Sequence, residues 1–255
     1  MERIKDYNTY TKGMKKTLED KAWFVKHIPS HIDTLVDFGC ADGAFIEYIE
    51  RTYPCRFAYY IAIDNDDVML RKASKRLSKY KDRVHFCLGL DGLIFSDVRS
   101  SVLVLNSVLH EVFSYCEPKE YDEFFANLRR LDFPFVAIRD MNADIDGWEH
   151  QSMWELGQTL KGLEPEMWNS MDKWGLDSID AASFILKYRY QENWAREKDE
   201  RYLWNIEHII QRELCMHKLQ EVEKFYIPFI FEQASKDFGM EIAPFNTHIK
   251  MLLAA

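Results

Sequence analysis

Five short apolar runs separated by helix-like segments are the feature that most restricts how this 255-residue chain can fold. The runs are continuously apolar, as are strands buried on both faces of a sheet. Amphipathic segments lie between them, for example at 44–50, 68–77 and 118–131. Strands that alternate with helices in this way predict βαβ units and a parallel sheet. The sequence therefore predicts an α/β, doubly wound core over residues 33–140, with strands at 34–38, 58–63, 84–88, 101–105 and 135–138.

The character of the chain changes after Asp140. Residues 142–201 are rich in tryptophan and charge and contain few strand-like runs, which predicts a helical insertion that leans on the sheet. One long helix is expected over 202–218. The predicted organisation is a helical cover over 1–32, a sheet domain over 33–141 and 202–255, and the insertion over 142–201. Within 202–255 we expect a short helix at 231–238 between two strands, 222–227 and 247–253, which complete the sheet as an edge pair.

The composition disfavours several kinds of partner. The formal net charge of −9 gives no basic footprint for a phosphate backbone, so nucleic acid is possible but not favoured. No apolar run reaches the roughly 20 residues that span a bilayer, and the first residues have no signal-peptide character. Five scattered cysteines include no CxxC pair, which favours free thiols in a reducing compartment. We therefore expect a cytoplasmic protein with no membrane partner.

A turn containing two glycines comes after the first predicted strand. In the segment Asp37-Phe38-Gly39-Cys40-Ala41-Asp42-Gly43, the glycines let the backbone approach a ligand closely before a helix begins. The next strand ends at Asp64, 21 residues after Gly43, where an acid accepts hydrogen bonds from ribose hydroxyls. This order predicts a nucleotide-like ligand. The alternative is ordinary turn glycines and an Asp64 that caps a helix.

Asp37 narrows the choice of ligand. A pyrophosphate resting on a helix N-terminus normally needs a third close glycine. A carboxylate on the strand would repel that pyrophosphate, whereas it suits a ligand that carries an ammonium and a sulfonium.

On these residues the chain resembles the class I S-adenosylmethionine-dependent methyltransferases, whose first motif is an acid followed by Gly-x-Gly-x-Gly. The resemblance covers roughly residues 33–140 and continues through Asp64, residues 90–92 and residues 105–112. It implies a Rossmann-like, mostly parallel seven-stranded sheet with the helical insertion after strand 5. It also implies S-adenosyl-L-methionine as the cofactor. Ala41 replaces the middle glycine, a mild departure unless residue 41 needs a positive φ.

The resemblance also implies a set of cofactor-binding residues. Asp37, Gly39 and Gly43, with Cys40 between the glycines, would surround the methionine part. Asp64 would hold the ribose. Asn65 would lie beside the adenine, Asp91 would meet the adenine amino group, Asn106 would close the pocket with its backbone, and Leu90, Gly92 and Ser107 complete the set. Residues 10–24 would fold over the cofactor or, alternatively, pack on the sheet edge.

The acceptor side of the reaction calls for a base. Methyl transfer from a sulfonium is an in-line displacement, so an enzyme mainly positions the acceptor and removes its proton. His110, after the fourth strand, can titrate near neutral pH and act as that base, or it packs against the domain and bonds a backbone carbonyl. Glu111 is interpreted as a solvated or helix-dipole residue. Arg139, after the fifth strand, binds an anionic substrate group or forms a structural ion pair, so His110 and Arg139 are the catalytic candidates.

The residues after the fourth strand disfavour several acceptors. Residues 106–109 form neither the Asp/Asn/Ser-Pro-Pro-aromatic motif of amino-methylating DNA enzymes nor a Pro-Cys nucleophile, and no cluster has metal-ligand spacing, so no metal is expected. The sequence predicts methyl transfer to a small molecule, with an RNA, nucleotide or protein acceptor, or a non-catalytic S-adenosylmethionine-binding regulatory module, as alternatives. Aromatic residues of the insertion form a lid over a small acceptor, form a packing core, or stack on nucleobases: Trp148, Trp154, Tyr188, Tyr190 and Trp194.

Overall fold

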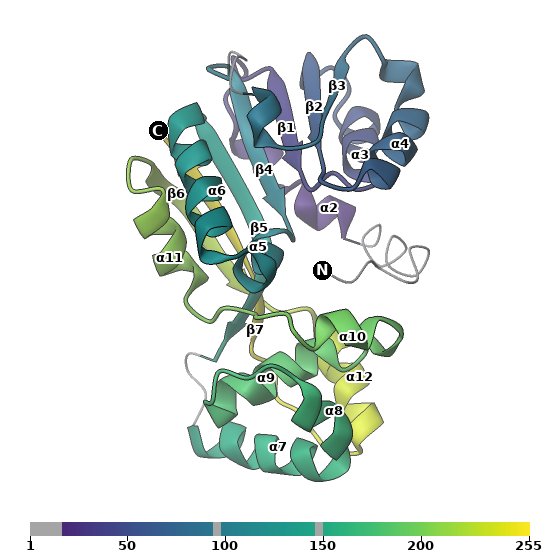
Figure 1. The fold of residues 1–255 in the computed structure, drawn as a ribbon, viewed down its shortest axis with the longest axis vertical. Coiled ribbons are helices and arrows are strands. Elements are labelled where there is room, and N and C mark those ends of the chain that lie inside the picture. Colours follow the sequence, from purple (N-terminus) through teal and green to yellow (C-terminus); the bar gives the residue numbers. More distant parts are fainter. Residues whose placement is uncertain (1–16, 94–97, 146–149) are drawn as a thin grey trace.

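The computed structural model describes residues 17–93, 98–145 and 150–255, and its centre is a seven-stranded sheet (Figure 1). The strand order is β3-β2-β1-β4-β5-β7-β6. Strands β1 to β5 are parallel, and β7 runs antiparallel to both β5 and β6. The predicted mostly parallel sheet with a C-terminal edge pair is confirmed. The strands are β1 Thr34–Phe38, β2 Tyr59–Ile63, β3 Val84–Cys87, β4 Ser101–Asn106, β5 Phe135–Asp144, β6 Lys218–Phe225 and β7 Asn246–Ala254.

Helices cover both faces of the sheet (Figure 1). Each face has its own buried apolar cluster, one including Phe45 and Ile46 and the other including Phe125 and Ile210. The first face carries α2 (Leu18–Lys21), η1 (Trp23–His27), α3 (Ala44–Thr52) and α4 (Asp67–Arg76); the second carries α5 (Leu109–Tyr115), α6 (Pro118–Leu131) and α11 (Ile206–Glu213). Short 3-10 turns η2 (Ser78–Tyr80) and η3 (Leu90–Leu93) flank β3. The doubly wound arrangement predicted for residues 33–140 is therefore present.

Local sequence signals set several helix ends. Asp66 caps α4, because its side chain accepts a hydrogen bond from the Val68 N–H at 2.8 Å. Helix α6 begins with a capping box between Glu117 and Glu120 and has Pro118 in its first turn. The Asp66 cap starts α4 three residues after the end of β2, so a short loop, residues 64–66, separates that strand from the helix.

A group of helices, here called the helical lobe, packs below the carboxyl ends of the strands (Figure 1). Its apolar cluster includes Met153 and Phe184 from the predicted insertion, and also Phe231 from α12, which connects β6 to β7. The lobe is therefore built from two chain segments, whereas the sequence placed the second segment wholly in the sheet domain. None of the described helices is long and apolar enough to cross a membrane. The elements of the lobe are α7 (His150–Leu163), α8 (Pro165–Ser170), α9 (Asp177–Lys187), η4 (Gln191–Asn193), α10 (Trp194–Glu197) and α12 (Pro228–Phe238).

The prediction of a single long helix over 202–218 is wrong. Helix α11 ends at Glu213, and the chain turns to enter β6 at Lys218. Strand β6 lies at the edge of the sheet, and most of its side chains are exposed or half-buried. An edge strand of this kind carries polar residues and lacks the continuous apolar run of a central strand. Of the predicted N-terminal cover, α2 and η1 are described, and residues 1–16 lie outside the described residues.

Candidate active site

The backbone of the turn after β1 requires glycine at positions 39 and 43. Gly39 has φ +77°, and a Cβ there would lie 3.0 Å from Val108 Cγ2. Gly43 has φ +75°, and a Cβ there would lie 2.9 Å from Leu77 Cδ1. Ala41 has φ +47°, so the residue in place of the family's middle glycine does adopt the left-handed region. The backbone N–H of Ala41 donates to Asp64 Oδ2 at 2.8 Å, and this bond holds the strained turn in place.

Asp64 joins the turn to the end of β2. Its second carboxylate oxygen accepts a hydrogen bond from the Asp66 N–H at 2.9 Å. Burial raises the pKa of Asp64, against the lowering effect of these backbone N–H groups. Each oxygen keeps a further lone pair, so the carboxylate can accept hydrogen bonds from a ligand without losing its backbone partners.

A cleft of about 800 Å³ opens at the carboxyl ends of β1, β2 and β4. It lies at the point where the strand order reverses, the usual ligand site of an open α/β sheet. Gly43 and Gly92 do not line this cleft. Gly92 packs against Cys87, which a Cβ at position 92 would approach to 3.2 Å. The predicted cofactor residues that line the cleft are Gly39, Asp64, Asn65, Leu90, Asp91, Asn106 and Ser107.

Asp37 and Cys40 line a separate, smaller cavity of about 20 Å³ beneath α2. Asp37 is buried, and its Oδ2 has no hydrogen-bond partner among the described residues. Burial raises the pKa of Asp37 to about 7. Lys21 of α2 lines the same cavity. Its pKa is lowered to about 8, chiefly by burial and to a smaller extent by repulsion from Arg139. A buried carboxylate oxygen without a partner fits the ammonium group of S-adenosylmethionine, since buried polar atoms are normally satisfied.

His110 is not among the residues that line the cleft. Its Nδ1 lies 2.6 Å from Asp140 Oδ1 in the buried interior. Burial opposes the charged ring, but the carboxylates of Asp140, Glu200 and Glu111 together outweigh it and raise the pKa of His110 to about 9. His110 therefore packs against the domain, which was the alternative to a base. Its hydrogen-bond partner is a carboxylate, whereas a backbone carbonyl was expected. A ring that holds its proton at neutral pH is poorly suited to act as a base.

Arg139 is likewise held inside the structure. Its Nε donates to Asp20 Oδ2 at 2.9 Å, and its Nη1 donates to Ser107 Oγ at 3.2 Å. Arg139 is buried and does not line the cleft. The structural ion pair considered for this residue is therefore observed, and it fixes α2 and Ser107 at the edge of the site.

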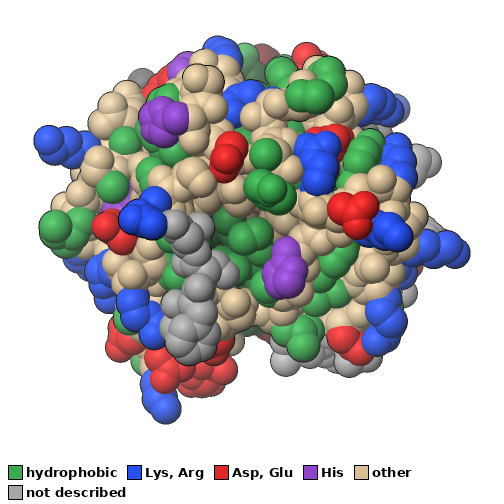
Figure 2. All heavy atoms as spheres, turned by 90° about the horizontal axis from the view of Figure 1, so that it is seen from above, with side chains coloured by type: hydrophobic (Ala, Val, Ile, Leu, Met, Phe, Trp, Pro, Cys, Tyr) green, Lys and Arg blue, Asp and Glu red, His purple; other side chains and the backbone are tan. Residues whose placement is uncertain are grey.

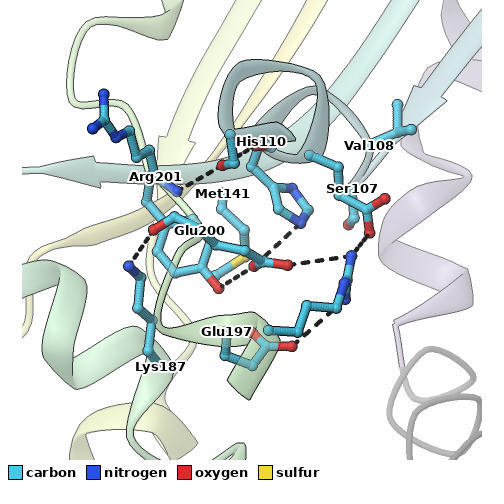
Figure 3. Close-up of polar contacts among 12 residues, drawn as sticks. Ser107, Val108, His110, Met141, Lys187, Glu197, Glu200 and Arg201 are labelled. Atoms are coloured by element: carbon cyan, nitrogen blue, oxygen red, sulfur yellow. Dashed lines mark hydrogen bonds and ion pairs between the residues drawn. The ribbon is translucent and has the colours of Figure 1, made fainter. Parts of the chain in front are cut away.

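A buried ionic network connects α5 to the helical lobe (Figure 3). Arg196 of α10 pairs with Glu111 of α5 and lies 3.3 Å from Glu200. Glu200 Oε2 lies 3.8 Å from His110 Nε2, and the backbone carbonyl of Glu200 accepts a hydrogen bond from Lys187 of α9. Glu111 and Arg196 line the cleft, so Glu111 is part of the site and not a solvated residue.

His110, Glu111 and Glu200 offer ligand atoms within 4.8 Å of one another, a spacing that could hold a metal ion. The Arg196 guanidinium already pairs with both glutamates, and the protonated His110 adds a second positive charge. These residues therefore fit a metal poorly in this arrangement.

The aromatic residues proposed as a lid lie elsewhere. Tyr188 is buried in the lobe, with its ring 4.8 Å from that of Phe238. Trp194 packs against Phe184 at 6.4 Å. Trp154 and Tyr190 are exposed, and Trp148 lies outside the described residues. None of the four residues that lie within the described part of the chain lines the cleft. Tyr188 and Trp194 belong to the packing core of the lobe, which was one of the alternatives.

Comparison with known proteins agrees with this geometry. Residues 36–131 match the family model Methyltransf_12, described as a methyltransferase domain. No curated protein sequence matches the chain. The small RNA methyltransferase HEN1 is 16% identical, with a TM-score of 0.53 over 94% of this chain and 25% of that one. The plantazolicin methyltransferase BpumL is 12% identical, with a TM-score of 0.51 over 96% and 88%. A SAM-dependent methyltransferase from Aquifex aeolicus is 13% identical, with a TM-score of 0.50 over 98% and 100%.

The fold and the glycine turn define a Rossmann-like α/β protein with a nucleotide site at its switch point. At such low identities, the similar structures show the fold alone. The matched region adds the family: residues 36–131 form a methyltransferase domain of the class I, S-adenosylmethionine-dependent type.

Proposed function

We propose that this methyltransferase acts on a small-molecule acceptor bound in the cleft beside Ser107 and Glu111. S-adenosylmethionine supplies an electrophilic methyl group on a sulfonium. The observation that carries the proposal is the charge of the cleft. Arg196 is the only basic residue among the described residues that line it, against seven carboxylates: Asp64, Asp66, Asp67, Asp91, Glu111, Glu120 and Glu123.

For the cofactor we propose the residues assigned from the sequence, in three roles. Asp37 would meet the ammonium, with Gly39, Cys40 and Gly43 shaping the turn around the methionine part. Asp64 would accept from the ribose hydroxyls. Asn65, Leu90, Asp91, Gly92, Asn106 and Ser107 would surround the adenine and close the pocket; Gly92 would act by packing, since it does not line the cleft. Helix α2 would cover the methionine part, as Lys21 and Leu18 already line the cavity at Asp37.

The same charges argue against a nucleic acid acceptor. A phosphate backbone requires a continuous basic surface, whereas the lining of the cleft is acidic. Figure 2 shows the end of the molecule opposite the helical lobe, where basic and acidic side chains are interspersed. The structurally similar proteins are named for small RNA in one case and for plantazolicin in another, so they do not decide the acceptor. A cytoplasmic location stays a prediction from the free cysteines.

The experiment has two parts. Calorimetric titration of the full chain with S-adenosylmethionine and S-adenosylhomocysteine should give a saturable site. Labelled S-adenosylmethionine should then transfer label to a pool of metabolites below about 1 kDa and not to total RNA or total protein. Absence of binding at millimolar cofactor would contradict the cofactor assignment. Label found only in RNA or protein would contradict the small-molecule acceptor and leave the cofactor assignment intact.

A further inference from the structure

We infer that the methyl acceptor is a cationic amine, held by carboxylates of α5 and α6 and deprotonated by Glu111. This inference rests on the proposed function and names the substrate class of the same cleft.

The described residues that line the cleft carry an excess of negative charge. Glu111 of α5 and Glu120 and Glu123 of α6 are among them, and Arg196 is the only cation of this described lining. Lys119 of α6, outside the lining, pairs with Glu123 at 3.6 Å in an exposed position, where such a pair contributes little. A cleft walled mainly by one sign of charge focuses the potential and concentrates counter-ions, so a positively charged acceptor is attracted to it.

The charge of Arg196 is already compensated. Its Nη2 pairs with Glu111 and lies 3.3 Å from Glu200, and its Nη1 lies 3.7 Å from Glu197. Its guanidinium carbon also lies 5.6 Å from the centre of the Tyr115 ring. An anionic acceptor would have to displace Glu111 from this buried pair, which leaves a buried carboxylate without its partner at a cost of several kcal/mol.

The cleft also offers an apolar surface for the body of an amine. Phe124 lines it and is supported from behind by Phe38, with ring centres 5.4 Å apart. An aromatic face also attracts a cation directly. Carboxylates and a half-buried ring in one cleft form a recognition surface for an ammonium attached to a small apolar body.

Glu111 is placed to handle the proton. An ammonium has no lone pair, so it must lose a proton before it can attack a methyl group. Glu111 lines the cleft from the first turn of α5, and burial raises the pKa of its carboxyl group, against the lowering effect of Arg196. The ammonium gives one proton to the Glu111 carboxylate and becomes a neutral amine. The nitrogen lone pair then forms the N–C bond as the S–C bond breaks, with its electron pair staying on the sulfur, and the Glu111 proton passes to water.

The test separates a metabolite pool below about 1 kDa into cationic, neutral and anionic fractions on ion exchangers at pH 7. Each fraction is incubated with the full chain and labelled S-adenosylmethionine. We expect the label in the cationic fraction. Label confined to the neutral or anionic fraction would overturn the amine and leave small-molecule methylation standing. Label in no fraction, with S-adenosylhomocysteine still bound, would overturn the small-molecule proposal and this inference together.

Three variants then test the residues, with S-adenosylhomocysteine affinity measured for each. Glu111→Gln should lower kcat at pH 7 by about 100-fold and recover activity at higher pH, where more of the amine is already neutral. Glu123→Gln should raise KM about threefold, with kcat unchanged. Asp122→Asn, exposed on the same helix and outside the cleft, should match the wild type. Wild-type kcat in Glu111→Gln, or a loss that is equal at every pH, would overturn the role of Glu111.

Discussion

Replacing His110 with glutamine removes a buried proton-binding group and tests whether that group is charged in the folded protein. The His110 ring lies 2.6 Å from Asp140 and 3.8 Å from Glu200, with Glu111 and Arg196 in the same network. Its pKa is raised from 6.5 to about 9. A shift of this size stabilises the charged fold by about 3 kcal/mol.

The sign of the pH dependence follows from the raised pKa. The stabilisation is fully present below about pH 6.5 and is lost as pH rises through about 9. On the acid side it is lost as Asp140, whose pKa is lowered chiefly by His110 against the effect of burial, becomes protonated. The difference in unfolding free energy between wild type and His110→Gln should therefore fall by about 3 kcal/mol between pH 6.5 and 9. Taking the difference cancels other buried groups, such as Asp37 and Lys21.

Urea unfolding followed by the fluorescence of the seven tryptophans measures these free energies at several pH values. His208→Gln, an exposed position on α11, is the control and should shift the curve equally at every pH. A difference for His110→Gln that does not change from pH 6 to 10 would refute the reasoning. That result would mean that the ring is neutral in the fold and is again a candidate base.

Four further predictions concern the cofactor turn and the ionic network. Asp64→Ala should weaken S-adenosylmethionine binding at least about 100-fold in calorimetry, because a charge-assisted pair is lost, while circular dichroism stays unchanged; wild-type affinity would contradict the ribose assignment. Gly43→Ala should lower the unfolding free energy by about 2 kcal/mol. The alanine would be strained at φ +75°, and its Cβ would lie only 2.9 Å from Leu77 Cδ1. Ala41→Gly should raise the unfolding free energy by about 0.5 kcal/mol in the same urea assay, since it relieves the positive φ. Chelation with EDTA should leave turnover unchanged, because Arg196 already pairs with Glu111 and Glu200 where a metal ion would bind. A loss of turnover that added Mg²⁺ reverses would contradict this.

The fold could be predicted where burial leaves a continuous apolar run. Strands β1, β2, β4 and β5 lie inside the sheet, and the runs at 34–38 and 101–105 coincide with β1 and β4 almost residue for residue. The start of strand β6 at Lys218 was missed, because only one side of an edge strand is paired and its polar residues resemble the exposed face of a helix. Helix α12 was partly predicted, but no local pattern shows that it packs on α9 rather than on the sheet.

The gathering of the residues after β1, β2 and β4 at one cleft could be predicted for the same reason. These residues come directly after strand ends, and parallel strands bring those ends to one edge. The ion pair between Arg196 and Glu111 could not be predicted, since the two residues lie 85 positions apart in the sequence. Charged residues in a helical stretch are usually solvated, and only the packing of the lobe buries these. The conformation of Ala41 was also out of reach, because a positive φ leaves no mark on the residue type when alanine adopts it.

Asp140 explains why the two halves of the site are not independent. One oxygen of this buried carboxylate accepts hydrogen bonds from the backbone N–H groups of Val108 and Leu109 at 2.9 and 2.6 Å, and this fixes the wall of the cleft after β4. The other oxygen holds His110, which in turn faces Glu200 from the lobe. A shift of the lobe must therefore break buried charge pairs or move α5 with it. Because breaking such a pair costs several kcal/mol, we expect the lobe and the wall after β4 to move together, and we expect selectivity for the proposed acceptor to depend on residues far from the glycine turn.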